Sequence, residues 1–223
     1  MAFDRNPSIQ SFNFGADVVE YLLRGDAPIT MLIVCSTRDV FLQQICASSS
    51  IAPTEPGNEH PEDAEECNLN RRFHNTIGLI AQSKRITLAF CPSLQHFCSY
   101  ISAFRRRRLM PLKQEDGDLQ REGGPLLAVL GLVALHYDTR EFSAQGIAKT
   151  LALTVEIAAR ERVNLALWEC LVVGREYASG GSLWEADVPL LSGQARGSMG
   201  GDNSHAGRTV KLKKVAKRWF YFV

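Results

Sequence analysis

Four short apolar runs limit the folds that this chain can adopt. They are "ITMLIVC" (29–35), "RITLAFC" (85–91), "LLAVLGLVAL" (126–135) and "VNLALWEC" (163–170). Each has the length of a strand, and none alternates apolar with polar residues as a strand with one solvated face would. Strands buried on both faces are typical of parallel sheets that carry helices on either side. The runs therefore predict a mostly parallel sheet with right-handed crossovers.

The segments between these runs have helical spacing. "ADVVEYLLR" (16–24) has the pattern of a short amphipathic helix that Gly25 closes. Ser36 or Thr37 is suited to cap the helix that follows the first run. Helical patterns resume at 71–83, and they resume again after Cys91 with apolar residues three and four apart that end at Arg105–Arg108. Strands that alternate with helices predict a three-layer α/β domain.

The longest helix is expected to begin at Ser143. Serine is a favoured N-cap residue, and Phe142 and Ile147 stand where a hydrophobic staple requires apolar side chains. The residues of its buried stripe then follow at helical spacing, at Ile147, Leu151, Val155 and Ala158.

The last third of the chain has a different pattern. Residues 182–193 and 208–223 alternate apolar and polar side chains, and a Gly-rich segment, 193–207, joins them. This arrangement predicts C-terminal antiparallel strands added at one edge of the sheet. The Gly-rich segment is a plain hairpin linker or a loop that contacts DNA, and the residues do not decide between the two.

Composition excludes several classes of protein. The chain has 223 residues, a net charge of +1, 45% hydrophobic and 22% charged residues, as in a soluble globular protein. It has no apolar run of about 18 residues that would span a bilayer, and its polar start, "MAFDRNPSIQSFNF", does not resemble a signal peptide. Six cysteines form no C-x-x-C pair and five histidines show no metal-ligand spacing. We expect reduced thiols in a cytosolic or nuclear protein, with no metal and no cofactor.

Segment 48–70 contains three prolines and several acidic residues with almost no hydrophobic ones, and so it predicts a mobile acidic loop. Such a loop is either a solubilising insertion or an acidic docking segment.

Two groups of cations are candidates for nucleic-acid contacts. Arg105, Arg106, Arg107 and Arg108 are adjacent in sequence. The second group is Lys211, Lys213, Lys214, Lys217 and Arg218, which follow Arg208 and precede Trp219 and Tyr221. Cations interleaved with aromatic rings are typical of surfaces that follow a phosphate backbone and stack on bases. The alternatives are a solvated surface for the arginines, and lysines that protect an edge strand beside aromatic core residues.

The sequence gives little support for a catalytic nucleophile. Ser36 and Thr37 precede Asp39, but no motif places a histidine beside them. Cys35 and Cys91 end apolar strands and have no feature that would activate a thiol. The residues therefore predict no catalytic site, no small-molecule substrate and no enzyme activity.

Several stretches resemble the RecA-like recombinase superfamily. "LLAVLGLVALHYDTREFSAQG" resembles the strand that carries the Walker B acid, with Glu141–Gln145 standing at the start of the helix that follows it. Leu165–Glu169 resembles the next strand, which ends near a DNA-binding loop in that family. Residues 29–45 and 85–97 resemble the second and third strands, and "TVKLKKVAKRWFYF" resembles the antiparallel strands that end the core.

The chain departs from that family at its nucleotide site. It has no G-x-x-x-x-G-K-[ST] motif, and Gly131 or an apolar neighbour stands in place of the Walker B aspartate. Phosphoryl transfer requires both the phosphate cradle and the Mg²⁺ ligand. The family's first strand and its loop are either missing or reduced to "CSTRDVF". The resemblance therefore implies a RecA-like protein that has lost ATP chemistry.

RecA-like proteins that have lost nucleotide binding usually act as subunits of larger assemblies. The resemblance implies a Shu-type recombination mediator subunit in the nucleus, which pairs with another RecA-like paralogue and contacts single-stranded DNA. The alternative is a structural subunit of an Elongator-type RNA-modifying complex. We expect a helical N-terminal segment (1–24), a RecA-like core (25–223) and a partner interface that includes Trp184, Trp219 and Phe220.

Overall fold

A computed structural model describes residues 7–50, 77–108, 124–172, 174–191 and 208–223. In these residues six strands form one sheet in the order β3-β2-β4-β5-β1-β8, and each pairing between neighbours is parallel. The strands are β1 (Ser8–Ser11), β2 (Thr30–Val34), β3 (Ile86–Phe90), β4 (Leu126–Leu130), β5 (Asn164–Glu169) and β8 (Tyr221–Phe222).

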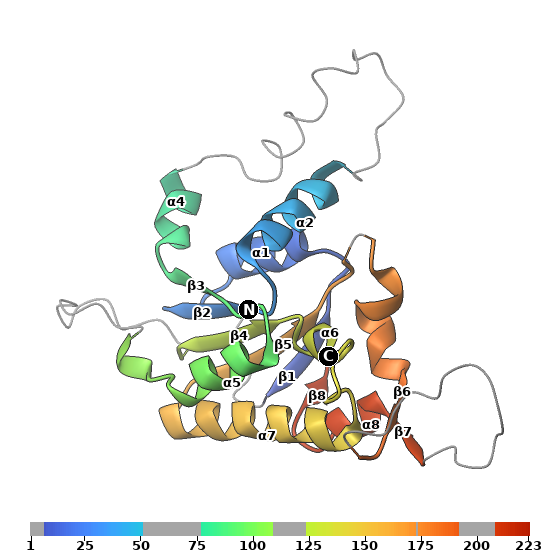
Figure 1. Cartoon of the computed structure of the whole chain (residues 1–223). Coiled ribbons are helices and arrows are strands. Elements are labelled where there is room, and N and C mark those ends of the chain that lie inside the picture. The colour runs from blue at the N-terminus through green and yellow to red at the C-terminus, as the bar shows by residue number, and fades with distance from the viewer. Residues whose placement is uncertain (1–6, 51–76, 109–123, 173, 192–207) are drawn as a thin grey trace, which may run out of the picture.

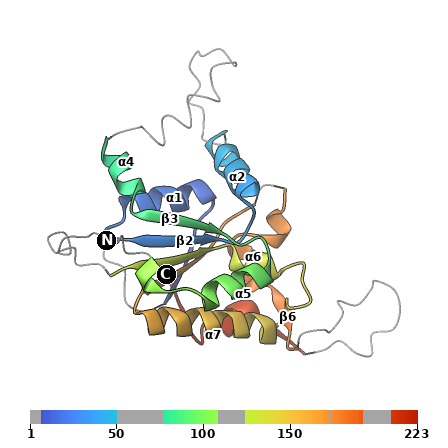
Figure 2. The same cartoon turned by 60° about the vertical axis from the view of Figure 1, so that its left-hand side comes forward.

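Helices lie on both sides of this sheet (Figures 1 and 2). One side carries α1 (Gly15–Arg24), α2 (Arg38–Ser50) and α4 (Ile77–Ser83). The other side carries α5 (Leu94–Ser102) and the long α7 (Ala144–Glu161), which pack against each other. The prediction of a three-layer α/β fold is confirmed.

The central strands are buried on both faces because successive side chains enter different cores. In β2, Leu32 belongs to the cluster that contains Leu22 of α1, whereas Ile33 belongs to the cluster that contains Leu151 of α7. The same alternation continues in β4 and β5. All five residues of β2 and all five of β4 are buried, which explains why Thr30 is the one polar residue among them.

Strand β1 lies inside the sheet although its sequence did not indicate a strand. Ile9 is its one large apolar residue and is fully buried, aligned with Leu167 of β5 and Phe222 of β8. One apolar side chain in four residues is too weak a pattern to recognise. The N-terminal segment before Gly25 thus contributes a strand to the sheet as well as the expected helix.

The expected helix boundaries are confirmed at three caps. The Oγ of Ser143 accepts a hydrogen bond from the Gly146 N–H at 3.0 Å, and α7 begins directly after Ser143. Gly25 closes α1. The hydroxyl of Thr37 accepts from the Val40 N–H at 3.3 Å at the start of α2.

The expected strand at 126–135 is wrong beyond Leu130. Gly131 has a left-handed φ of 78° and caps a short helix, α6 (Leu132–His136). A residue in this conformation cannot continue a strand, and glycine adopts it without steric cost. The apolar run therefore covers a strand and a buried helical turn, which periodicity cannot separate.

The C-terminal prediction is right about the antiparallel pair and wrong about its extent. β6 (Asp187–Pro189) and β7 (Thr209–Lys211) pair antiparallel, but they form a separate two-stranded sheet. Residues 181–185, where the sequence predicted the start of a strand, form a 3-10 helix, η3 (Gly181–Glu185). Two further 3-10 helices are η1 (Arg106–Arg108) and η2 (Glu176–Ala178). Helix α8 (Leu212–Ala216) follows β7, and the final strand β8 is parallel to β1.

The start of α7 makes Gly146 a position that cannot carry a side chain. A Cβ atom there would lie 2.3 Å from the carbonyl oxygen of Glu141, which also accepts a hydrogen bond from the Ser143 N–H. Alanine normally stabilises a helix interior by about 1 kcal/mol over glycine, whereas forced overlap in a packed region costs roughly 1–3 kcal/mol.

We therefore expect Gly146→Ala to lower the free energy of unfolding, measured by chemical denaturation. Glu156→Ala, on the exposed side of the same helix, is the control and should change it by less than about 0.5 kcal/mol. A Gly146→Ala variant as stable as the natural chain would contradict this packing.

Candidate functional site

Ligands of open α/β sheets bind beyond the carboxyl ends of the strands. Strand β1 ends at Ser11 and α1 begins at Gly15, so only residues 12–14 connect them. Such a connection is too short to wrap around a triphosphate in the way that a Gly-rich loop does.

Aromatic side chains fill the space beside this connection. The ring of Phe12 lies edge-on to Trp168, with 5.8 Å between ring centroids, and 5.3 Å from the ring of Tyr21. Tyr21 is itself edge-on to Trp168, and Trp168 is completely buried. The three rings pack into one apolar cluster at the carboxyl ends of β1 and β5.

A carboxylate occupies the N-terminus of α1. The Oδ2 atom of Asp17 accepts a hydrogen bond from the Phe14 N–H at 3.1 Å. The carbonyl of Asn13 accepts from the Leu171 N–H at 2.9 Å, which fixes the connection to the segment after β5. The partial positive charge of a helix N-terminus favours an anion, and here the protein supplies that anion itself.

The carboxyl end of β4 carries no acid. The Gly131 N–H donates to the carbonyl of Trp168 at 2.8 Å. The carboxylate found in this region is Glu169, at the end of β5; its Oε1 accepts from the Val133 N–H at 2.6 Å and its Oε2 from the Ala134 N–H at 3.3 Å. The side chain is completely buried and caps α6 from within the protein. The sequence indicated a strand at Leu165–Glu169 but not this cap.

Burial shifts the pKa values of two groups around α6 in opposite directions. It raises the pKa of Glu169 to about 8, against the opposing effect of the two backbone N–H donors. It lowers the pKa of His136 to about 4; this ring hydrogen-bonds to the Glu141 carbonyl through Nδ1, and its Nε2 is buried without a hydrogen-bond partner.

A cavity of about 360 Å³ lies next to the carboxyl ends of β2, β4 and β5. Its walls include Val34, Leu130 and Val172, and the ion pair between Asp138 and Arg175 lies on its lining. The lining is mainly apolar, and its two charged side chains neutralise each other. It therefore offers no charged group for acid–base chemistry.

The sequence candidates for a nucleophile have structural roles here. The Ser36 hydroxyl donates to the Thr37 carbonyl at 3.2 Å, and Thr37 caps α2. Burial raises the pKa of the Cys35 thiol well above its usual value and also raises that of Cys91. A raised pKa disfavours the thiolate that nucleophilic attack requires.

Three general features of the described residues concern cysteines, metal-ligand clusters and membrane-spanning helices. Their five cysteines are free. Within those same ranges, no three His, Cys, Asp or Glu side chains gather as a metal site would require. No helix in the described part is both long and apolar enough to span a bilayer.

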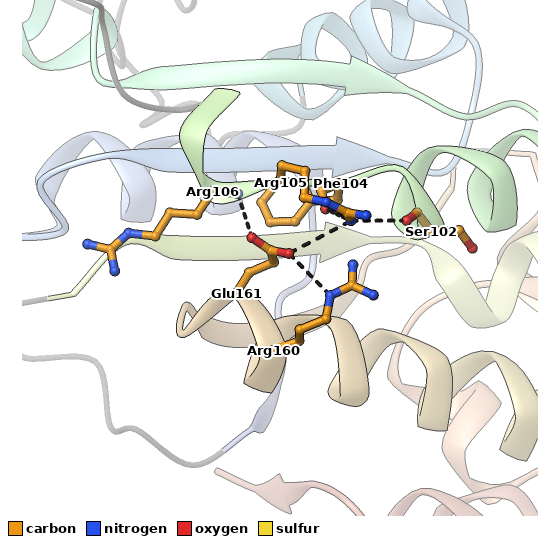
Figure 3. Close-up of polar contacts among 6 residues, drawn as sticks. All are labelled: Ser102, Phe104, Arg105, Arg106, Arg160 and Glu161. Atoms are coloured by element: carbon orange, nitrogen blue, oxygen red, sulfur yellow. Dashed lines mark hydrogen bonds and ion pairs between the residues drawn. The ribbon is translucent and has the colours of Figure 1, made fainter.

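The arginine cluster is organised around Glu161, the last residue of α7 (Figure 3). Glu161 accepts from the Arg106 backbone N–H at 3.0 Å and from Arg160 Nε at 3.2 Å, and it lies 3.8 Å from Arg105 Nη1. These donors hold the pKa of Glu161 below its usual range, the Arg106 hydrogen bond contributing most. Arg105 also donates to the carbonyls of Phe104 at 2.7 Å and Ser102 at 3.4 Å.

The sequence suggested that Arg105–Arg108 end helix α5, and this expectation is wrong. That helix ends at Ser102, and Phe104 is buried between the helix and the 3-10 turn. Arg105 and Arg106 join this turn to the end of α7, Arg105 through its guanidinium and Arg106 through its backbone N–H, so of these two only the charge of Arg105 is paired there. Arg107 is exposed, and the side chain of Arg108 lies outside the described residues.

Two of the C-terminal lysines also have acidic neighbours. Lys211 Nζ lies 2.9 Å from Asp187 Oδ2 and donates to the Glu185 carbonyl at 2.8 Å. Lys213 Nζ lies 3.3 Å from Glu185 Oε1 and 5.3 Å from the centre of the Phe222 ring. These contacts tie β7 and α8 to β6 and to η3, which precedes β6.

The remaining three cations line a groove of about 510 Å³ between α7, α8 and the β6–β7 pair. They are Lys214, Lys217 and Arg218, all exposed, and within the described part of the chain none forms an ion pair. Two of these five C-terminal cations are thus paired with acidic side chains, and three are left to contact a ligand.

The residues expected at a partner interface lie mostly in the protein's own core. Trp184 and Phe220 are each 3% exposed, and Trp219 is partly buried against the same core. Apolar side chains are exposed elsewhere, on α4 and the edge strand β3, at Ile77, Ile80 and Leu88. The Gly-rich segment 193–207 and the acidic segment from residue 51 onward lie outside the described residues.

No protein-family model and no curated protein matches the chain.

The opposite pKa shifts of Glu169 and His136 predict a particular dependence of stability on pH. Glu169 has a folded-state pKa near 8, above its ordinary value of 4.5, so its contribution is complete below about pH 4.5 and is lost as the pH rises through about 8. His136 has a folded-state pKa near 4, below its ordinary value of 6.5, so its contribution is complete above 6.5 and is lost as the pH falls through 4.

The free energy of unfolding should therefore fall between about pH 6.5 and 8, where the contribution of Glu169 declines and that of His136 is constant, and Glu169→Gln should remove most of this decline. Denaturant titrations across this range test it, with Glu156→Ala as a control that keeps the decline. Should the variant fail to fold, a carboxyl ¹³C titration of the natural protein gives the same answer. A Glu169 resonance that titrates near 4.5 would contradict the proposed environment.

Proposed function

We propose that this chain is a non-catalytic, RecA-like subunit of a nuclear complex that mediates homologous recombination and DNA repair. In this proposal it neither binds nor hydrolyses ATP. It assembles with another RecA-like paralogue and contacts single-stranded DNA through its basic surface. The observation that carries the proposal is the connection from β1 to α1, where Phe12 and Asp17 occupy the positions that a phosphate cradle would need.

The position of β1 supports this reading. β1 precedes β2, and β2 contains the residues that resemble the second strand of RecA-like proteins. Under the proposal, β1 is the family's first strand and residues 12–14 are what remains of its P-loop. β4, which resembles the Walker B strand, is separated from β1 by β5 alone. The carboxyl ends of β1 and β4 thus flank one region, as a nucleotide and its Mg²⁺ ligand require.

The chemistry of that region argues against phosphoryl transfer. Catalysis of this reaction depends on positioning and on charge stabilisation of the phosphates. The region instead contains an aromatic cluster, a carboxylate at the start of α1 and a glycine at the end of β4. Both the rings and the carboxylate would oppose binding of a triphosphate.

The exposed apolar side chains support a role as a subunit. Ile77 is 88% exposed, Ile80 52% and Leu88 47%. Leu88 lies on β3, whose outer edge pairs with no other strand among the described residues. Exposed apolar side chains beside an open sheet edge are typical of surfaces that another protein covers.

The first test concerns nucleotide binding. Calorimetric titration of the full chain with Mg·ATP should give no binding heat, since the chain lacks a lysine, a glycine cradle and a metal ligand at this position. A RecA-like ATPase titrated under the same conditions is the positive control. Saturable binding with a micromolar Kd would overturn the proposal.

The second test concerns assembly. Purification from the native source, followed by mass spectrometry, should recover a RecA-like paralogue and recombination proteins. On co-expression with that paralogue, Leu88→Lys should reduce co-purification, because it places a charge among the exposed apolar side chains. Glu156→Lys, on the exposed side of α7, is the control and should have no effect.

A chain that elutes as a monomer and recovers no RecA-like protein would contradict the subunit role. Recovery of an RNA-modifying complex would overturn the recombination assignment and would favour the Elongator-type alternative.

A further inference from the structure

The three unpaired cations of the C-terminal segment share one face of the chain. Lys214, Lys217 and Arg218 are three and four residues apart, and side chains at this spacing lie side by side on a helical turn. The helical backbone continues past the end of α8, since the Lys217 N–H donates to the Lys213 carbonyl at 3.0 Å and the Arg218 N–H to the Val215 carbonyl at 3.4 Å. The three charges therefore extend together along one wall of the groove.

The facing wall of the groove has small, uncharged side chains, so it leaves room for a ligand and does not neutralise the three charges. It consists of Ala144, Gln145 and Ala148 at the start of α7. Two of these side chains are methyl groups, and the third is an uncharged amide. Leu190 and Val210 of the β6–β7 pair complete the lining. Among the described residues no acidic side chain lines the groove, and the nearby Asp187 and Glu185 pair with Lys211 and Lys213 instead.

We infer that this groove binds the phosphates of a single nucleic-acid strand, with Lys214, Lys217 and Arg218 as the contacting residues. The inference rests on the proposed function and deepens it, because it assigns the DNA contact to one of the several basic patches. Lysines supply point charges, and the arginine fork can donate two parallel hydrogen bonds to one phosphate.

A nucleic-acid strand fits the groove better than an acidic peptide does. Proteins that bind single strands combine cations that follow the backbone with apolar surface against which sugars and bases rest. Leu190 and Val210 provide such a surface beside the cations, and Leu190 is partly exposed. The phosphodiester is common to DNA and RNA, so the recognised group is the phosphate and the test must compare the two sugars.

Three of the other candidate cations are predicted to contribute little. The guanidinium of Arg105 is paired with Glu161, Lys211 with Asp187 and Lys213 with Glu185. A cation that already has an acidic partner gains less from a phosphate, since binding must first break that contact.

The test measures binding of fluorescein-labelled oligo(dT) by anisotropy across a range of salt concentrations, using the full chain, with its partner where assembly requires it. Each phosphate contact on a single strand contributes roughly 0.7 to the slope of log affinity against log salt. Removing three contacts in Lys214→Ala/Lys217→Ala/Arg218→Ala should flatten the slope by about 2, which corresponds to about a hundredfold loss of affinity at 0.1 M salt.

The matched control is Arg24→Ala/Arg38→Ala/Lys84→Ala, which removes the same charge from exposed positions on the other side of the sheet, at the end of α1, at the start of α2 and directly after α4. Its slope should stay within about 0.5 of that of the natural chain. Gln145→Glu, which places a carboxylate in the groove with almost no change in shape, should also weaken binding. Near-ultraviolet circular dichroism and the unfolding midpoint confirm that each variant is folded.

An unchanged slope in the folded groove variant would overturn the inference, and so would tighter binding of polyglutamate than of oligo(dT). Equal binding of oligo(dT) and oligo(rU), with both lost in the groove variant, would support phosphate recognition. If the groove variant binds normally while the chain still assembles with a RecA-like paralogue, only this inference fails. If the natural chain neither assembles nor binds an oligonucleotide, the proposed function fails with it.

Discussion

The packing of Trp168 determines what the carboxyl edge of the sheet can do. This indole is completely buried on β5, next to the ends of β1 and β4, and the rings of Phe12 and Tyr21 meet it edge-on. Its backbone carbonyl accepts the Gly131 N–H and so also fixes the end of β4. The indole N–H is buried without a hydrogen-bond partner, so ring packing alone holds this side chain. A ligand between the end of β1 and the start of α1 would have to displace that cluster.

In the same region, carboxylate side chains occupy helix N-termini that could otherwise bind an anionic ligand. Asp17 and Glu169 each accept backbone N–H groups at the start of a helix, where an α/β enzyme would place a phosphate. Glu169 does so while completely buried, and for that reason its pKa rises to about 8. These two helix starts are thus satisfied within the chain. Under our proposal the functional charge lies instead beside the start of α7, on residues 214–218.

Much of the fold could be predicted because the central strands are buried on both faces. β2 and β5 are central strands and lie where apolar runs occur, and the edge strand β3 also lies in an apolar run although its residues are exposed or half-buried. Ser143 and Gly25 mark helix ends through local hydrogen bonding that sequence reveals directly. β1 was missed because Ile9 is its single large apolar residue. α8 was read as a strand because Val210 and Leu212 alternate, although Leu212, Val215 and Ala216 already have the spacing of a helix.

The candidate site was predictable only in part. The cations were found from their residue types, but sequence could not tell which of them have acidic partners, because Lys211 and Lys213 meet acids more than twenty residues away. Trp184 and Phe220 were expected at a surface and are core residues, since burial of an aromatic ring depends on tertiary packing.

We propose that the sheet has lost its nucleotide site and that the ligand contact lies on α8 and the two cations that follow it. Hydrogen–deuterium exchange of one sample, with Mg·ATP and separately with oligo(dT), tests both parts. The account predicts that ATP leaves the exchange of residues 12–17 unchanged and that oligo(dT) slows exchange in residues 212–218. Slower exchange of residues 12–17 with Mg·ATP, or no change in residues 212–218 at saturating oligo(dT), would contradict it.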